Sequence, residues 1–288
     1  MKELILNADD FGLTMGINEA IVRAHRDGIL TSATVMASMP AFQDAVARAK
    51  SNPSLGVGVH LVLVDGRPIA PPNEVSSLLD ENGEFSRSLP AFVARLTAGL
   101  IRQEHIEREL RAQIGKVRSA GIEPSHVDTH KHTHAHPKVM ESVARVAKES
   151  GITRLRKPFE DLHDSWASTR ENRAAAVPQL TAAAAARLAS RSFEAICRRY
   201  GLRFPDRFLG LAATGGINAG ILRSLIDRVE DGVTEIMLHP GICDTDLAQT
   251  GSRLQMHRQL ELDALLARGL RGVLNERGIR LISYREVH

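Results

Sequence analysis

The chain has 288 residues, of which 43% are hydrophobic and 25% charged, so it can bury a substantial core like an ordinary globular protein. Its net charge of +3 is small, its arginines form no dense basic block and only 4% of its residues are aromatic, which argues against a nucleic-acid-binding protein. No stretch approaches about 18 uninterrupted apolar residues, so we expect no transmembrane helix, while peripheral membrane contact stays open.

Short apolar runs alternate with helical patterns through the first 64 residues. We expect buried strands at 3–8, 31–38 and 55–64, of which the last is rich in valine and leucine. Helical periodicity separates them at 16–28, where a glycine closes the pattern, and at 41–51. Strands and helices therefore alternate, as they do in chains that form parallel sheets.

The alternation continues to the carboxyl terminus. An amphipathic helix at 104–121 precedes a strand at 125–130, and a helix at 137–151 has Pro137 in its first turn. The remaining expected elements are strands at 153–158, 207–213, 233–241 and 279–284, with helices at 216–229 and 254–269. Repeated units of this kind favour an α/β fold with a parallel sheet, either open or closed into a (β/α) barrel.

Two segments interrupt the alternation. Residues 65–103 contain the turn signals DGRPIAPP and DENGEF, and residues 159–206 contain an alanine-rich helical pattern at 181–201. No internal repeat or flexible linker is apparent. We therefore expect a single domain over 1–288, with insertions at about 65–103 and 159–206.

The cysteines and the amino terminus indicate the compartment. Cys197 and Cys243 lie far apart and form no CxxC pair, which favours a reducing environment. The opening MKELILNADDFG has too short an apolar run for the core of a signal peptide. We expect a cytoplasmic protein.

The stretch PSHVDTHKHTHAHP, residues 124–137, contains five of the twelve histidines. Functional groups of α/β sheets and barrels gather beyond the carboxyl ends of their strands. Six candidate side chains fall at or near the ends of four predicted strands: Asp9, Asp10, His60, Asp128, His130 and His239. We therefore expect segments that are remote in sequence to meet at one site.

An aspartate and two histidines are suitable ligands for a divalent cation. A second carboxylate beside such an ion can act as a general base, and a histidine across the site can act as a general acid. Each residue alone has a plainer interpretation, because aspartates often cap helices, strand histidines are often structural and histidine runs are often solvated. Their joint placement favours a metal site without identifying the reaction.

Four segments in this order, NADDFGLT, GVGVHLVLV, PSHVDTHKHTHAHP and EIMLHPG, resemble the YdjC/ChbG-like carbohydrate deacetylase family. The resemblance runs from Leu4 to about His239, and HLVLVDGRP and THKHTHAHP are most similar to HpnK, the branch associated with hopanoid biosynthesis. It implies a (β/α) barrel-like deacetylase fold, as a distorted or incomplete TIM-type barrel. It also implies removal of the acetyl group from an N-acetylated sugar with one divalent metal cation. The family implies Mg²⁺, and histidine ligands would also suit Zn²⁺.

Carried over by position, the resemblance implies three metal ligands: Asp10, His60 and His130. It implies Asp9 as the general base and His239 as a catalytic acid or transition-state stabiliser.

The chain departs from related sequences just after Asp128. It has Thr129 where they have a serine, and Lys131 interrupts their histidine triplet. A protonated lysine cannot be a ligand, which leaves His132 and His134 as residues that support the ligands or face the substrate.

Three further residues are candidates for similar supporting roles. Asp128 could hydrogen-bond a ligand histidine. Arg156 could clamp a substrate or brace a loop, and Asp244 could orient His239 or terminate a turn.

The favoured substrate is the N-acetylglucosaminyl group of a hopanoid glycolipid or of a chitooligosaccharide. One alternative is a metal-dependent phosphoesterase or other hydrolase on a similar barrel, for which two metal ions are expected. The other is a non-catalytic metal-binding protein, for which several weakly bound ions are expected. At the family level we also expect a homodimer.

Overall fold

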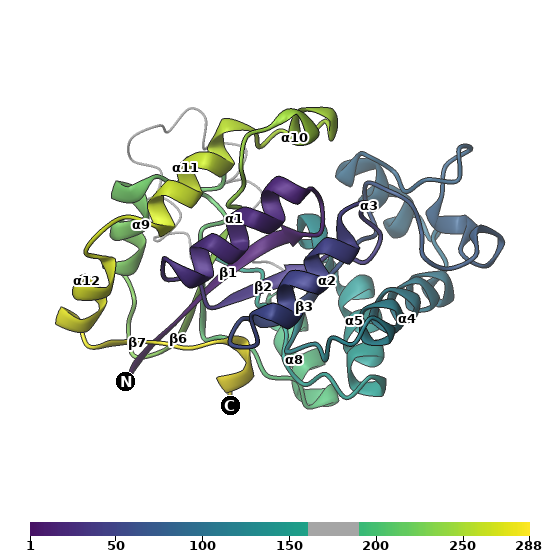
Figure 1. The fold of residues 1–288 in the computed structure, drawn as a ribbon. Helices are drawn as coiled ribbons and strands as arrows, with labels where there is room; N and C mark the ends of the chain where they lie inside the picture. The colour runs from purple at the N-terminus through teal and green to yellow at the C-terminus, as the bar shows by residue number, and fades with distance from the viewer. Residues whose placement is uncertain (161–189) are drawn as a thin grey trace.

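The computed structural model describes residues 1–160 and 190–288 (Figure 1). Within these residues a parallel sheet has seven strands: β1 (Lys2–Phe11), β2 (Ser32–Val35), β3 (Gly56–Leu61), β4 (Val127–Thr129), β5 (Arg207–Leu209), β6 (Gly232–Leu238) and β7 (Ile279–Leu281). The order is β4-β3-β2-β1-β6-β5, and β7 pairs with β1. Every pairing is parallel, so the carboxyl ends of all these strands lie at the same end of the sheet.

Between β4 and β5 the sheet continues only through isolated bridges. Val127 pairs with Leu155, and Arg154 pairs with Arg203, both in the parallel sense. The strand expected at 153–158 is therefore reduced to these two bridging residues, and Pro158, which has no N–H group, cannot extend the ladder. The strands and bridges together form a distorted, incomplete barrel, which confirms the predicted α/β fold.

Helices surround the sheet, and Figure 1 shows α1 and α2 lying across β1, β2 and β3. The described helices are α1 (Met15–Arg26), α2 (Phe42–Ser51), α3 (Leu89–Thr97), α4 (Gln103–Ser119), α5 (Pro137–Glu149), α8 (Ser190–Tyr200), α9 (Ala219–Ile226), α10 (Thr245–Gln249), α11 (Met256–Leu265) and α12 (Leu270–Glu276). Four short 3₁₀ helices complete them: η1 (Pro72–Glu74), η2 (Ser76–Leu78), η3 (His130–Ala135) and η4 (Tyr284–Glu286). None of these helices is long and apolar enough to cross a membrane.

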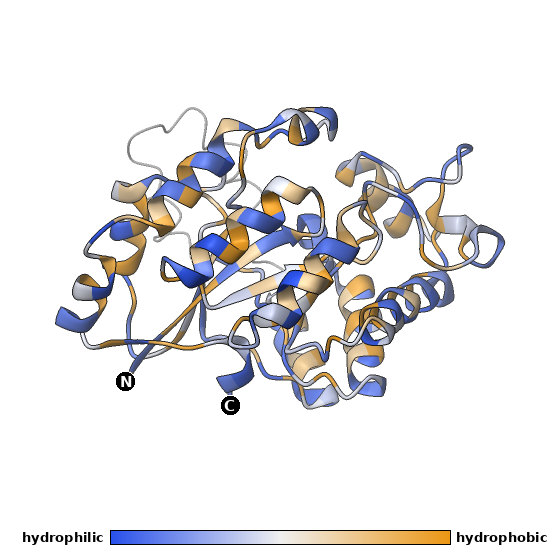
Figure 2. Cartoon of the chain, in the orientation of Figure 1, coloured by the Kyte–Doolittle hydropathy of each residue, from blue (hydrophilic) through white to orange (hydrophobic). Residues whose placement is uncertain are grey.

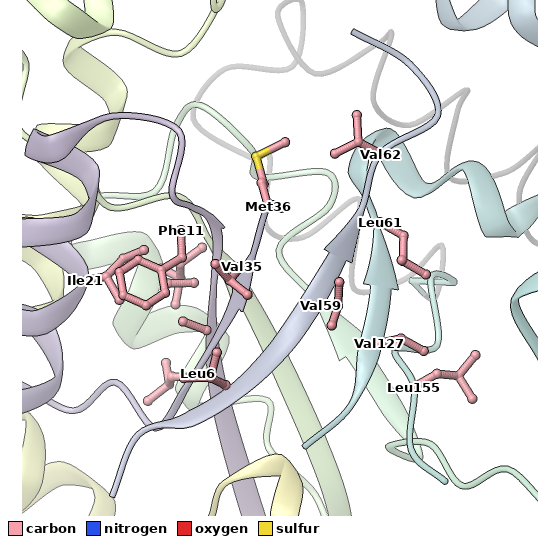
Figure 3. Close-up of a cluster of buried hydrophobic side chains, with 14 of the residues drawn as sticks. Leu6, Phe11, Ile21, Val35, Met36, Val59, Leu61, Val62, Val127 and Leu155 are labelled. Carbon is pink, nitrogen blue, oxygen red and sulfur yellow. The ribbon is translucent and has the colours of Figure 1, made fainter. Parts of the chain in front are cut away.

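The helices are amphipathic, and their apolar sides cover the sheet. Figure 2 shows hydrophilic and hydrophobic residues on different sides of the helices around the strands. In the core, Phe11 of β1 lies beside Ile21 of α1, and Val35 and Val59 extend the cluster along β2 and β3 (Figure 3). β3 is buried along its whole length, which explains why its sequence is a continuous apolar run without alternation.

The helix expected at 254–269 is α11, which is shorter than predicted. Gly269 follows it with a left-handed backbone (φ 84°), and the chain then turns into α12, which the sequence analysis did not predict. A positive φ is incompatible with a continuous α-helix, and glycine is the residue that adopts it without steric cost.

The insertion at 65–103 forms η1, η2 and α3, and it extends to the right in Figure 1. Two buried residues of α4 tie it to the barrel. The Glu109 carboxylate accepts hydrogen bonds from the backbone N–H groups of Ile69 and Ala70 at 2.9–3.2 Å. The Gln113 amide exchanges hydrogen bonds with both backbone groups of Val62. The insertion is thus fixed to the end of β3.

The second predicted insertion, 159–206, is described only in part, because 161–189 lie outside the described residues. Of the helix expected at 181–201, the described portion is α8. Phe193 and Ile196 are buried and Tyr200 is partly buried against the core, as its predicted apolar face requires.

Candidate metal centre

The predicted strand ends do meet. His60 of β3 and Asp128 of β4 are direct register partners, and His130 follows β4 at the start of η3. Asp9 and Asp10 arrive from β1, two strands away in the sheet. Four of these residues are buried: Asp9, Asp10 and His60 are each 2% exposed, and Asp128 is 1% exposed.

An irregularity in β1 allows consecutive aspartates to serve one site. Successive side chains of a regular strand point to opposite faces. The register between β1 and β2 shifts between Ala8 and Phe11, and Asp10 adopts a left-handed backbone with φ 68°. Asp9 and Asp10 therefore both face the interior of the barrel mouth. There Asp9 contacts Arg156, and Asp10 contacts Arg258.

Asp10, His60 and His130 form the candidate metal centre. One ligand atom of each lies within 4.8 Å of the others. Asp10 Oδ1 is 3.7 Å from His60 Nε2 and 3.4 Å from His130 Nδ1, and the two ring nitrogens are 3.3 Å apart. These spacings suit one ion bonded to all three atoms at about 2.0–2.2 Å. Asp10 Oδ1 is moreover buried without a hydrogen-bond partner, as expected of an atom reserved for a cation.

The other atoms of the three ligands are already held in place. Asp10 Oδ2 accepts a hydrogen bond from Arg258 at 2.5 Å, so only Oδ1 is available. His60 Nδ1 donates to Asp128 Oδ1 at 2.7 Å, which leaves Nε2 facing the centre with its lone pair. Thr34 of β2 lies 3.2 Å from the same Nδ1 and 3.3 Å from Asp128 Oδ2.

Charged neighbours shift the pKa values of all three candidate ligands. Burial would raise the pKa of Asp10, but Arg258 and His130 hold it well below its usual value. Burial would lower the pKa of both histidines, yet Asp128 raises that of His60, and Asp10 with Asp65 raises that of His130 to about 9. A site that attracts a proton this strongly also attracts a metal cation, which competes for the same nitrogen atoms.

A second group of possible metal ligands lies beside the first, but an arginine side chain of the protein already occupies it. Ligand atoms of Asp9, His60 and Asp128 also lie within 4.8 Å of one another. The guanidinium of Arg156 occupies this position: its two terminal nitrogens contact the two oxygens of Asp9 at 2.6 and 2.7 Å, and one of them contacts Asp128 Oδ2 at 2.6 Å. Glu235 binds the Nε edge of the same guanidinium at 2.9 Å. The described residues therefore offer one open cation site and one position that the Arg156 guanidinium fills.

His239 faces this group from the end of β6. Its Nε2 lies 3.9 Å from Asp9 Oδ2, and its buried Nδ1 forms no hydrogen bond within the described structure. Burial lowers the pKa of His239 to about 4 in spite of Asp9 and Asp10, so the ring is neutral near pH 7. The backbone N–H of His239 donates to Glu261 Oε2 at 2.5 Å, which anchors the strand end to α11.

Comparison with known proteins identifies the family of the chain. A family model described as YdjC-like protein matches residues 3–276. The chain belongs to the YdjC-like family. A carbohydrate deacetylase of Geobacillus stearothermophilus is 39% identical over 99% of this chain and 97% of its own length. A carbohydrate deacetylase of Brevibacillus brevis is 36% identical, with 99% of each chain covered. The crystal structure of an Enterococcus faecalis protein, provisionally described as a cellobiose-phosphate cleavage protein, superposes with a TM-score of 0.79 at 29% identity, covering 98% of this chain and 97% of that one.

The YdjC resemblance of the sequence is thus confirmed, while the HpnK branch stays a prediction. The remaining candidate residues of this YdjC-like protein differ in how close they lie to the centre. His132 has a buried Nδ1 without a hydrogen-bond partner, and its ring meets Phe208 edge-on at 5.7 Å. His134 is fully buried, and its two ring nitrogens bind Thr129 Oγ1 and the backbone carbonyl of Arg156. His134 therefore braces η3 and has no ring nitrogen left for a substrate.

The contacts of Arg156 and Asp244 are explained by structural roles. Arg156 is fully buried with its guanidinium directed to carboxylates, so its placement favours bracing over contact with a substrate. Asp244 accepts a hydrogen bond from Leu247 N at 2.8 Å as the amino-terminal cap of α10. None of the described hydrogen bonds joins Asp244 to His239.

Backbone strain is concentrated at this end of the YdjC-like barrel. Among the described residues, those other than glycine with positive φ are Asp10, Asp65, Lys131 and His132. Lys131 Nζ binds Asp65 Oδ2 at 2.5 Å, and the same oxygen lies 3.5 Å from His130 Nε2. Strained conformations of this kind persist where surrounding contacts enforce them, and they are common at functional sites.

Several residues of the site were not found by sequence analysis: Thr34, Asp65, Glu235, Arg258, Glu261 and Tyr284. Glu235 carried a usable signal, since it interrupts the otherwise apolar run of β6. Arg258 and Glu261 carried none, because charges three positions apart on a helix are typical of a solvent-exposed pair.

Proposed function

We propose that this chain is a metal-dependent carbohydrate deacetylase, which hydrolyses the acetamide of an N-acetylated sugar. The observation that carries the proposal is the buried Asp10 Oδ1, which lacks a hydrogen bond and faces one nitrogen each of His60 and His130. The relatives named carbohydrate deacetylase, which align over nearly the whole chain, supply the reaction class.

Asp10, His60 and His130 would hold one divalent cation. When bound, such an ion supplies a Lewis acid for the amide carbonyl and lowers the pKa of water. A set of two nitrogens and one oxygen suits zinc, and magnesium stays open from the family resemblance.

Asp9 would act as the general base on the attacking water. Arg156 holds both oxygens of Asp9, which fixes the plane of the carboxylate beside the metal centre. Asp9 would take a proton from the water. His239 is the neighbouring acceptor for that proton, because its Nε2 lies 3.9 Å from Asp9 Oδ2.

His239 would deliver the proton to the leaving sugar nitrogen. Its ring is neutral near pH 7, since burial lowers its pKa to about 4. It must therefore gain a proton during turnover before it can act as the acid, and Asp9 is the adjacent source.

The filled second cation position argues against the phosphoesterase alternative. Two-metal phosphoesterases place their ions about 3.5–4 Å apart. Here the carboxylates of Asp9 and Asp128, which a second ion would require, are bound to Arg156.

The test is acetate release from a panel of N-acetylated substrates, with and without a chelator. The panel includes chitooligosaccharides and, in detergent, an N-acetylglucosaminyl hopanoid. We expect chelator-sensitive release from at least one substrate, and complete loss of release in Asp9→Asn protein that still binds Zn²⁺. Undiminished release from metal-free protein, or phosphate release from phosphoesters with no acetate release, would overturn the proposal.

A further inference from the structure

Polar side chains continue below Asp9 into the interior of the barrel. Arg156, Glu235 and Tyr284 are all fully buried there, and they connect the mouth of the barrel to the carboxyl-terminal segment. Arg156 binds Asp9 with its two terminal nitrogens and Glu235 Oε1 with its Nε edge at 2.9 Å. The Tyr284 hydroxyl then donates to the second oxygen of Glu235, Oε2, at 2.5 Å.

Tyr284 is itself fixed on several sides. Its ring stacks on that of His126, with centroids 3.6 Å apart and planes 7° from parallel. Its backbone N–H donates to Ser32 Oγ at 3.1 Å, at the start of β2. Tyr284 therefore presents its hydroxyl to Glu235 from a rigid position. It lies in η4, beyond the matched region 3–276 of the family model.

We propose that Glu235 and Tyr284 are positioning residues for the reaction, which hold the Arg156 guanidinium and through it the plane of Asp9. The inference rests on the proposed function, in which Asp9 accepts a proton from water. The carboxyl-terminal segment after Glu276 then belongs to the catalytic apparatus, although it lies at the opposite end of the chain from Asp9.

The charge balance explains why the chain needs both residues. Three buried carboxylates, those of Asp9, Asp128 and Glu235, share the single guanidinium of Arg156. Burial raises the pKa of Glu235 to about 7, against the opposing effects of Arg156 and the Tyr284 hydrogen bond. Without the Tyr284 hydroxyl, Glu235 Oε2 loses its partner in a site that excludes water, and the Nε edge of Arg156 is held less firmly.

Phenylalanine at position 284 separates this role from simple packing. The Tyr284→Phe variant keeps the ring and its stack on His126, and it removes only the hydroxyl. The chain supplies a matched control in its other tyrosine, Tyr200, whose hydroxyl also donates to a carboxylate, that of Glu141, at 2.6 Å. Tyr200 lies on α8, away from the proposed positioning chain.

The experiment measures kcat and KM for acetate release by metal-loaded wild-type, Tyr284→Phe, Glu235→Gln, double-variant and Tyr200→Phe proteins. We expect Tyr284→Phe to lower kcat about tenfold with KM changed by less than about twofold, the range seen for residues that support catalytic groups indirectly. The double variant should be no slower than Glu235→Gln alone, because both changes act on one contact. Tyr200→Phe should match wild type, and Zn²⁺ affinity should be equal in all five proteins. A kcat of Tyr284→Phe within twofold of wild type, or additive losses in the double variant, would overturn the inference.

A second measurement keeps this test separate from that of the activity. The Arg156 Nε–H, donated to a buried carboxylate, should give a slowly exchanging NMR resonance in wild type and Tyr200→Phe. In Tyr284→Phe that resonance should shift and exchange faster. If wild type releases no acetate from any substrate, the proposed function fails, and an Arg156 resonance unchanged by Tyr284→Phe would overturn the positioning role as well.

Discussion

Replacement of Arg156 by methionine tests whether a fixed cation holds the acidic interior of the barrel together. Methionine fills much of the same space and removes the charge. The carboxylates of Asp9, Asp128 and Glu235, each at most 2% exposed, would then lack their shared partner. Loss of one partner from a buried ion cluster costs about 3–5 kcal/mol, a large part of the total of about 5–15 kcal/mol that stabilises a domain.

The cost should depend on pH in a defined direction. Burial would raise the pKa of Asp128, but Arg156 and His60 hold it well below its usual value of 3.8. A depressed pKa contributes stability above the unfolded value, and that contribution is lost as the pH falls through the folded value. Wild type keeps this contribution at both pH 7 and pH 5, since both lie above 3.8. In Arg156→Met, burial without a partner raises the pKa values of the carboxylates, so they take up protons as the pH falls from 7 to 5. The difference from wild type should therefore be largest at pH 7 and smaller at pH 5.

Urea unfolding followed by far-UV circular dichroism at pH 7 and pH 5 measures both effects. Arg108→Met is the control, because Arg108 forms an exposed pair with Glu74 at 2.7 Å that is worth at most about 1 kcal/mol. A loss below about 1 kcal/mol at pH 7 for Arg156→Met, or a loss equal at both pH values, would refute the reasoning. Stable Arg156→Met protein should also bind a second Zn²⁺ ion by isothermal titration calorimetry, since the carboxylates of Asp9 and Asp128 lose the cation that they share.

Three further variants probe separate parts of the site. Asp10→Asn should weaken Zn²⁺ binding by more than about 100-fold in calorimetry, and an unchanged affinity would move the metal elsewhere. Burial lowers the pKa of His126 from 6.5 to about 3, so only the unfolded chain gains its proton as the pH falls below 6.5. Between pH 6.5 and pH 5 this costs about 2 kcal/mol of unfolding free energy, which urea titrations of His126→Phe should show to be absent. Asp244→Ala should lose only a helix cap, about 1 kcal/mol, and a large fall in kcat would assign it a role at His239 instead.

The sequence predicted that the candidate ligands would meet, because the carboxyl ends of parallel strands lie at the same end of a sheet. Asp10 follows an apolar run, His60 lies within one, and His130 ends the predicted strand at 125–130. Family resemblance assigned them one cation. Their proximity in the structure agrees with that assignment, which stays a prediction until a bound ion is measured. The barrel itself was predictable for the same reason, since buried parallel strands separated by amphipathic helices leave few alternatives.

The charged groups around the centre could not be predicted, because their burial depends on the shape of irregular segments. Arg154 and Arg156 are equivalent in the sequence RLRKP, yet only Arg156 enters the interior. Residues two positions apart in an extended segment point to the same side, so the two arginines differ in their partners: Arg154 binds the backbone carbonyl of Val287, whereas Arg156 binds buried carboxylates. The burial of Arg258 could not be predicted either, because its position on α11 is typical of an exposed residue.

The two adjacent aspartates show how one strand end provides two kinds of carboxylate. The left-handed turn at Asp10 sends its side chain to Arg258, which binds one oxygen and leaves the other free for a metal. Arg156 donates a hydrogen bond to each oxygen of Asp9. A carboxylate held at both oxygens has a fixed orientation, while one held at a single oxygen can bond directly to an ion. In the proposed mechanism, the different arginine contacts of Asp9 and Asp10 therefore separate the base from the ligand, and exchange of the two roles would require both arginines to move.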